Sequence, residues 1–126
     1  ADITKISKIR SVCPDLTIYS GNDEMIVPVI SLGGKGVISV LSNILPEITH
    51  EIPARYLAGD FKGSAKLQLE YLALCNALFT DVNPIPVKEA MNMMGLNVGP
   101  LRMPLAPMTD TAREALRAEL KKHNLI

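Results

Sequence analysis

The apolar positions in the first 58 residues alternate between helical and strand-like spacing. Ile3, Ile6 and Ile9 recur every three positions behind Asp2, a residue type favoured as a helix cap, and predict a short helix. The expected elements are, in order, this helix, which ends at Cys13-Pro14, a strand at 16–19, a helix at 24–32 that ends at Gly33-Gly34, a strand at 36–40 and a helix at 46–58. Pro28 requires either a kink in its helix or a place in the first turn. The order is typical of β/α units with parallel strands.

The rest of the chain predicts helices and one loop. Two apolar stripes along 61–80 predict one long helix that must be covered on two sides. A shorter helix is expected at 87–94, and a last one runs from the cap Thr109 to about Lys122. The proline-rich segment 99–107 between them is expected to be a loop.

The expected sheet is too small to be stable by itself. Two parallel strands cannot form an independent sheet, because parallel sheets are buried and multi-stranded. The alternation of helices and parallel strands predicts an α/β fold class. The chain is either an unusual small fold or, as we favour, the C-terminal part of a longer barrel or doubly wound protein.

Charge and composition exclude several classes of protein. Thirteen basic and thirteen acidic residues give no net charge, which argues against binding to nucleic acid or anionic membranes. Cys13 and Cys75 match no zinc or disulfide pattern, and we expect two buried, reduced thiols. The sequence shows no membrane-length apolar run and no secretory signal, so a cytoplasmic location is expected.

Candidate chemistry follows the predicted strands, because ligands of β/α proteins bind at the C-terminal ends of the strands. This selects 20–23, with Gly21, Asn22 and Asp23, and 38–43. Asn22 and Asp23 could instead do no more than cap a helix. The other candidates are expected to be ordinary surface residues: Lys35, Lys88, His50 and His123.

Three stretches carry a family resemblance. They are YSGNDEMIVPVISLGGKGVISVLSN (19–43), NPIPVKEAMNMMG (83–95) and LRMPLAPMTDTAREALRAELKKHNLI (101–126). Each resembles the dihydrodipicolinate synthase (4-hydroxy-tetrahydrodipicolinate synthase) family, whose members are TIM (β/α)8 barrels with a helical C-terminal extension. The resemblance implies that 1–58 supply the last β/α units of the barrel and 59–126 the three-helix extension.

The resemblance also implies an activity. Family members form a Schiff base between a lysine and pyruvate, condense it with aspartate β-semialdehyde in lysine and diaminopimelate biosynthesis, and need no metal or organic cofactor. That lysine is expected just upstream of Ala1, so no catalytic residue is expected in this chain, which should be inactive alone. The partners implied are the N-terminal part of the same polypeptide and further copies of it, commonly in a homotetramer.

Four positions of this sequence match substrate-binding positions of the family. Ile38 corresponds to the residue whose backbone carbonyl contacts pyruvate. Gly21 corresponds to the glycine on the semialdehyde side, with Asn22 and Asp23 at the mouth of the cleft. Many family members have aspartate where this chain has the uncharged Asn22.

Two other functions are compatible with the sequence. The relative N-acetylneuraminate lyase shares the fold and the imine step, although the segments GVISV and NPIPVK favour the synthase. A non-catalytic association module could instead use the stripe of Leu67, Tyr71, Leu74 and Leu78.

Overall fold

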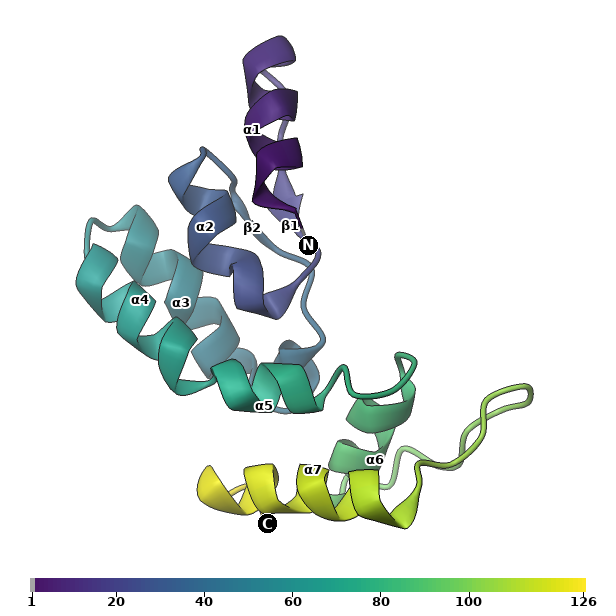
Figure 1. Cartoon of the computed structure of the whole chain (residues 1–126). Coiled ribbons are helices and arrows are strands. Elements are labelled where there is room, and N and C mark those ends of the chain that lie inside the picture. Colours follow the sequence, from purple (N-terminus) through teal and green to yellow (C-terminus); the bar gives the residue numbers. More distant parts are fainter. Residues whose placement is uncertain (1) are drawn as a thin grey trace. The chain divides into compact units, whose positions relative to one another are not determined.

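A computed structural model describes residues 2–126 of the chain. The chain divides into two compact units, Ala1–Glu70 and Tyr71–Ile126, and each is described by itself (Figure 1). These units are separated by how compactly their residues pack. The boundary expected at 58/59 is of another kind, because it separates a barrel from its helical extension. The expected boundary therefore stays a prediction.

The first unit has the predicted order of helices and strands. Its elements are α1 (Ile3–Val12), β1 (Tyr19–Ser20), the 3₁₀ turn η1 (Asp23–Met25), α2 (Ile26–Ser31), β2 (Gly36–Val37), the 3₁₀ turn η2 (Leu41–Asn43), α3 (Pro46–Leu57) and α4 (Phe61–Glu70). The two strands pair in parallel, with Tyr19 opposite Gly36 and Ser20 opposite Val37. The predicted parallel arrangement is confirmed.

Both strands are shorter than the runs of β-branched residues predict. Regular pairing covers two residues in each strand, whereas 16–19 and 36–40 were expected. One bond on each side continues the pairing, from Lys35 N–H to the Ile18 carbonyl (2.8 Å) and from Ile38 N–H to the Ser20 carbonyl (2.7 Å). A strand is defined by its partner as well as by its residues, and in the described part of the chain each strand has one partner.

Helix ends in this unit follow the predicted caps. The Asp2 carboxylate accepts a hydrogen bond from Thr4 N–H at 2.9 Å and so begins α1. Pro28 lies in the first turn of α2, where its missing N–H costs no helical bond. After α2, Gly33 has a φ of +89°, a conformation that favours glycine.

Helices cover one face of the two-stranded sheet. Ile26 and Ile30 of α2 and Ile52 of α3 form a buried core, and Val37 of β2 packs against it. Side chains alternate between the faces of a strand, so the neighbours of Val37 point the other way. Ile38, which follows β2, is 72% exposed, and Tyr19 is 52% exposed. One face of the sheet is therefore uncovered in the described chain.

The second unit consists of α5 (Leu72–Ala77), α6 (Ile85–Met93) and α7 (Asp110–Lys122). Helix α7 packs against both α5 and α6, and Leu74, Leu78, Ala90, Leu116 and Leu120 are buried. Thr109 caps α7 as predicted, because its hydroxyl accepts a bond from Ala112 N–H at 3.3 Å. The segment 99–107 is a loop, also as predicted.

The single long helix predicted over 61–80 is wrong. Helix α4 ends at Glu70 and α5 begins at Leu72, while Tyr71 between them has φ −98° and ψ 5°. Cys75 N–H donates to the Tyr71 carbonyl, so helical bonding resumes at once. Neither glycine nor proline marks this break, and apolar spacing continues across it, which is why periodicity predicted one helix.

None of the helices in residues 2–126 is long and apolar enough to cross a membrane.

Candidate functional site

The parallel register brings the C-terminal ends of the two strands together. Gly21 follows Ser20 of β1, and Ile38 follows Val37 of β2, the residue opposite Ser20. The bond from Ile38 N–H to the Ser20 carbonyl joins these two ends at 2.7 Å. Two of the residues selected from the sequence therefore lie at one edge of the sheet, the edge at which β/α proteins bind ligands.

Gly21 leaves open space at this edge. A Cβ atom built on Gly21 would have no other atom within 4 Å, and its φ is not in the left-handed region. Neither strain nor crowding therefore requires glycine here. A small hollow of about 70 Å³ adjoins it, lined by Tyr19, Asn22, Met25 and others. Glycine at such a position allows a ligand to approach the backbone.

Asn22 is partly buried and does not cap a helix with its side chain. Its amide Nδ2 donates to Glu24 Oε1 at 3.1 Å, and its backbone carbonyl accepts from the Ser20 hydroxyl at 2.8 Å. No side-chain cap bond forms at the start of η1. The structure therefore does not support the cap alternative for Asn22.

Asp23 lies inside the unit, 1% exposed. Its Oδ2 accepts two backbone hydrogen bonds, from Val40 N–H at 3.0 Å and from Leu41 N–H at 2.9 Å. Its Oδ1 is buried without a hydrogen-bond partner among the described residues. The carboxylate is taken up by the chain segment after β2, and a place for Asp23 at the mouth of a cleft stays a prediction. A contact between Asp23 and a substrate stays a prediction.

Gln68 is the residue that sequence reasoning missed. It lies on α4, is 7% exposed, and bonds to the same region through both ends of its amide. Its Oε1 accepts from Val27 N–H at 2.8 Å, and its Nε2 donates to the Asp23 carbonyl at 2.9 Å. One signal was available: a glutamine between two apolar stripes of one helix faces the covered side and needs partners there.

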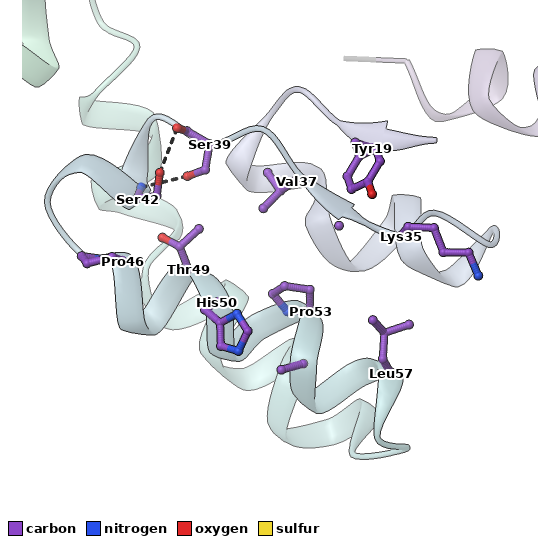
Figure 2. Close-up of a pocket in the computed structure, with 12 residues that line it drawn as sticks. Tyr19, Lys35, Val37, Ser39, Ser42, Pro46, Thr49, His50, Pro53 and Leu57 are labelled. Atoms are coloured by element: carbon purple, nitrogen blue, oxygen red, sulfur yellow. Dashed lines mark hydrogen bonds between the residues drawn. The ribbon is translucent and has the colours of Figure 1, made fainter. Parts of the chain in front are cut away.

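A larger groove of about 480 Å³ lies between β2 and α3. Figure 2 shows side chains of the strand segment, such as Val37 and Ser39, on one side and those of α3, such as Thr49 and Pro53, on the other. Its lining is mostly apolar, with the exposed Lys35 and His50 among its residues. Ser42 N–H donates to Ser39 Oγ at 2.9 Å and closes one end.

The remaining candidates have structural or surface roles. Lys88 Nζ donates to the Pro100 carbonyl at 2.8 Å and holds the proline-rich loop on α6. His50 is exposed as expected, whereas the partly buried His123 stacks on Tyr71 with ring centres 4.7 Å apart. Among residues 2–126, no three side chains of metal-binding type are grouped.

The expectation of two buried thiols holds for one cysteine. Cys75 is buried, but Cys13 is exposed. Cys13 caps the end of α1, a helix that buries none of its residues, and it is therefore exposed with that helix.

Comparison with known proteins gives consistent matches. The model of the dihydrodipicolinate synthetase family matches residues 1–123. A 4-hydroxy-tetrahydrodipicolinate synthase of Lachnoclostridium phytofermentans is 56% identical over 127 residues, covering 100% of this chain and 43% of that protein. A crystal structure of a dihydrodipicolinate synthase aligns with a TM-score of 0.95 and 41% identity over 99% of this chain and 43% of its own. The Thermotoga maritima synthase aligns with a TM-score of 0.91 and 38% identity, over 99% of this chain and 44% of its own.

The chain spans 43% of the length of the Lachnoclostridium phytofermentans relative, and the resemblance inferred from three motifs extends over its whole sequence. The match to the family model covers far more than half of the residues. On these grounds the chain belongs to the dihydrodipicolinate synthetase family.

Proposed function

We propose that this chain is the C-terminal part of a 4-hydroxy-tetrahydrodipicolinate synthase. The complete enzyme condenses pyruvate with aspartate β-semialdehyde through a lysine Schiff base, in lysine and diaminopimelate biosynthesis. Support comes from the 56% identity to a synthase of that name across the whole chain. A cytoplasmic location and a homo-oligomeric assembly, a tetramer in many family members, form part of the same proposal.

The observation that carries the proposal is the meeting of Gly21 and Ile38 at one edge of the sheet. In the proposed site the Ile38 carbonyl lies against bound pyruvate, and Gly21 lets the semialdehyde approach the backbone. Asn22 lies beside Gly21 and offers a polar side chain. Ile38 and Gly21 thus act through a backbone carbonyl and through open space. Such roles suit a chain segment that binds substrate while another part of the polypeptide supplies the reacting amine.

The chemistry needs an amine close to the bound ketone. The lysine amine adds to the pyruvate carbonyl, water leaves, and the protonated imine accepts the electron pair when a methyl proton is removed. The resulting enamine attacks the aldehyde, and cyclisation releases the lysine. In this proposal the reacting lysine belongs to the part of the polypeptide that precedes this chain, together with the residues that move the protons.

Neither Lys35 nor Lys88 suits the role of nucleophile. Lys35 precedes β2 and therefore lies at the end of the strand opposite to Ile38. The Lys88 amine is occupied by the Pro100 carbonyl. This chain is accordingly proposed to supply binding groups, not the covalent step.

The uncovered parts of the first unit fit a barrel that other strands complete. Among the described residues β2 has a strand partner on one side only, and the side chains of Tyr19 and Ile38 are exposed. Further parallel strands would pair with the free edge and cover these side chains. We therefore propose that β1 and β2 are the last two strands of a (β/α)8 barrel, and that 59–126 form the helical extension.

The test uses a polypeptide of the relatives' full length, which we call the joined enzyme. In it, this chain replaces the 127 residues that it matches in the Lachnoclostridium phytofermentans synthase. The joined enzyme is treated with pyruvate and then with borohydride, which reduces the imine to a stable amine. Peptide mass spectrometry is expected to find the adduct on a lysine of the N-terminal part. An adduct on Lys35 or Lys88, or none at all, would contradict the proposal.

The second substrate separates the synthase from its relatives. The joined enzyme is expected to consume pyruvate in the presence of aspartate β-semialdehyde and to leave N-acetylneuraminate uncleaved. Cleavage of N-acetylneuraminate without use of the semialdehyde would assign the chain to a different lyase of the same chemistry.

A further inference from the structure

We propose that Gln68 and Asp23 are positioning residues that fix the backbone carbonyl of Ile38 for pyruvate. The inference rests on the proposed function and adds two residues to it that act through the backbone. Gln68 belongs to α4 and makes no hydrogen bond to Ile38 itself. Its effect on the Ile38 carbonyl must therefore pass through other groups. Three consecutive sets of hydrogen bonds connect it to Ile38.

The first set of bonds runs from α4 to the start of α2. Gln68 Oε1 accepts from Val27 N–H, which lies in the first turn of α2 and has no partner within its own helix. Gln68 Nε2 donates to the Asp23 carbonyl at 2.9 Å. A single side chain, 7% exposed, thus fixes the backbone at the first residue of η1 and just after η1. Rotation of this segment would leave buried polar groups unpaired, which is costly.

The second set of bonds runs from η1 to the segment after β2. With its backbone held by Gln68, Asp23 directs Oδ2 at the N–H groups of Val40 and Leu41, at 3.0 and 2.9 Å. The carboxylate is 1% exposed, so water does not compete for it. The start of η2 is thereby held to η1.

The third set of bonds fixes the residue that would contact pyruvate. Ile38 N–H donates to the Ser20 carbonyl at 2.7 Å, and two residues later Val40 N–H is held by Asp23. Ser39 between them is tied to Ser42 by two bonds, at 2.9 and 3.1 Å. The Ile38 carbonyl therefore lies in a backbone segment anchored on both sides, and its direction depends on both anchors.

Small errors in such a direction have large effects on binding and catalysis. Misplacement of a reacting group by about 1 Å can reduce a rate by about a hundredfold. The expected effect of loosening one anchor is smaller, because the bond to Ser20 remains. The effect should appear in the binding of pyruvate, since the Ile38 carbonyl is proposed to contact pyruvate and not the semialdehyde.

The test replaces Gln68 in the joined enzyme by methionine, which has a similar length but no amide. Ser64→Ala is the matched control. Ser64 lies one turn earlier on α4, is 0% exposed, and donates a buried bond to the Ile52 carbonyl at 2.7 Å. Gln68→Met loses two hydrogen bonds of α4 and Ser64→Ala loses one, but only Gln68→Met loosens the segment that leads to Ile38.

Asp23 is tested by a pair of substitutions, because Asp23→Ala risks loss of folding. Asparagine can keep the acceptor oxygen for Val40 and Leu41, and its NH₂ group would replace Oδ1, which has no partner among the described residues. Asp23→Asn is therefore expected to retain most pyruvate binding, and Asp23→Ala to lose it.

We expect Gln68→Met to raise KM for pyruvate about tenfold, with KM for the semialdehyde within about twofold of the parent. Hydrogen–deuterium exchange is expected to accelerate in the peptide that contains Val40 and Leu41. Ser64→Ala should also lower thermal stability and leave both KM values unchanged. If KM for pyruvate is unchanged in Gln68→Met, or rises equally in Ser64→Ala, the positioning role is wrong. If the parent joined enzyme forms no pyruvate adduct, the proposed function is wrong and this inference falls with it.

Discussion

The two units of the chain bury different kinds of side chain. In the first unit Ser20, Asp23, Thr49, Ser64 and Gln68 are buried although they are polar. In the second unit the buried side chains among the described residues are apolar, as in Leu78, Ala90 and Leu120, and include the thiol of Cys75. Side-chain bonds to the backbone in the second unit, such as that of Lys88, are exposed.

This difference separates two tasks. A buried hydrogen bond adds direction as well as free energy, because its loss leaves a polar group unpaired. Two of the buried polar groups of the first unit, Asp23 and Gln68, join α4, η1 and η2 at the strand ends, where the candidate site lies. Apolar packing in the second unit stabilises the helices of that unit. Substitutions of Asp23 and Gln68 should therefore change substrate binding, and those of buried apolar residues in the second unit should change stability alone.

The largest effect is expected in the second unit, from Leu120→Ala. Leu120 on α7 is 0% exposed, and removal of its side chain should lower the free energy of unfolding by about 2–5 kcal/mol. Urea unfolding of the joined enzyme, followed by circular dichroism, measures the change. Leu96→Ala is the control, because Leu96 is 52% exposed and should cost little. A rise in KM for pyruvate in the folded Leu120→Ala variant would contradict the separation of tasks.

The next effect is expected at Ile38. Ile38→Pro removes the N–H that donates to the Ser20 carbonyl and should raise KM for pyruvate about a hundredfold. Ile38→Val should have little effect, because the side chain is 72% exposed in this chain and the proposed contact is made by the backbone. Steady-state kinetics of the two variants measures the difference. A normal KM for pyruvate in Ile38→Pro would exclude the proposed role.

Two glycines of the first unit sharpen the contrast between binding and packing. At Gly21 a Cβ would meet nothing within 4 Å, so Gly21→Ala should change stability by less than about 0.5 kcal/mol. It should raise KM for the semialdehyde about threefold or more, because the methyl group occupies the space proposed for that substrate.

Gly34→Ala should behave in the opposite way. A Cβ there would lie 2.7 Å from Val29 Cγ1 and 2.8 Å from the Val29 carbonyl oxygen. Overpacking of this kind costs about 1–3 kcal/mol, and the site is not involved. Thermal unfolding and KM for both substrates are measured for the two variants. Equal effects of Gly21→Ala and Gly34→Ala on KM for the semialdehyde would contradict the assignment of Gly21 to binding and Gly34 to packing.

The smallest effect is expected at the exposed cap of α1. The side-chain hydrogen bond from Thr4, followed by the bond from Thr4 N–H, lowers the pKa of Asp2 from its ordinary value of 3.8. A lowered pKa means that the ionised form stabilises the folded state. That stabilisation is fully present above 3.8 and is lost as the pH falls through the lowered pKa. Amide exchange at Thr4 should accelerate over this range, and Asp2→Asn should show no such pH dependence.

Local signals predicted several features of the fold correctly. The caps at Asp2 and Thr109 and the stop at Gly33 each depend on residues within one element. The order of helices and strands predicted the parallel pair, because a crossover helix between two strands favours that direction. The motifs also predicted the family.

The features that were wrong or missed depend on distant partners. The break at Tyr71 carries no glycine or proline, and the strand lengths depend on how far a partner continues. The burial of Asp23 depends on Val40 and Leu41, which are 17 and 18 residues away in the sequence. Gln68 bonds to Val27 across 41 residues. No spacing rule within one helix or strand describes such bonds.

The sequence by itself determined the order of the elements, most of their ends, the family, and the positions of Gly21 and Ile38 after the two strands. These follow from local backbone preferences, hydrophobic spacing and motifs, which are written in consecutive residues. Only the tertiary structure decided which polar groups hold the strand ends, and it placed Asp23 inside the unit and assigned Gln68 to it. A buried polar side chain bonds to whatever backbone group the folded chain brings within about 3 Å, and that is settled when the elements pack together.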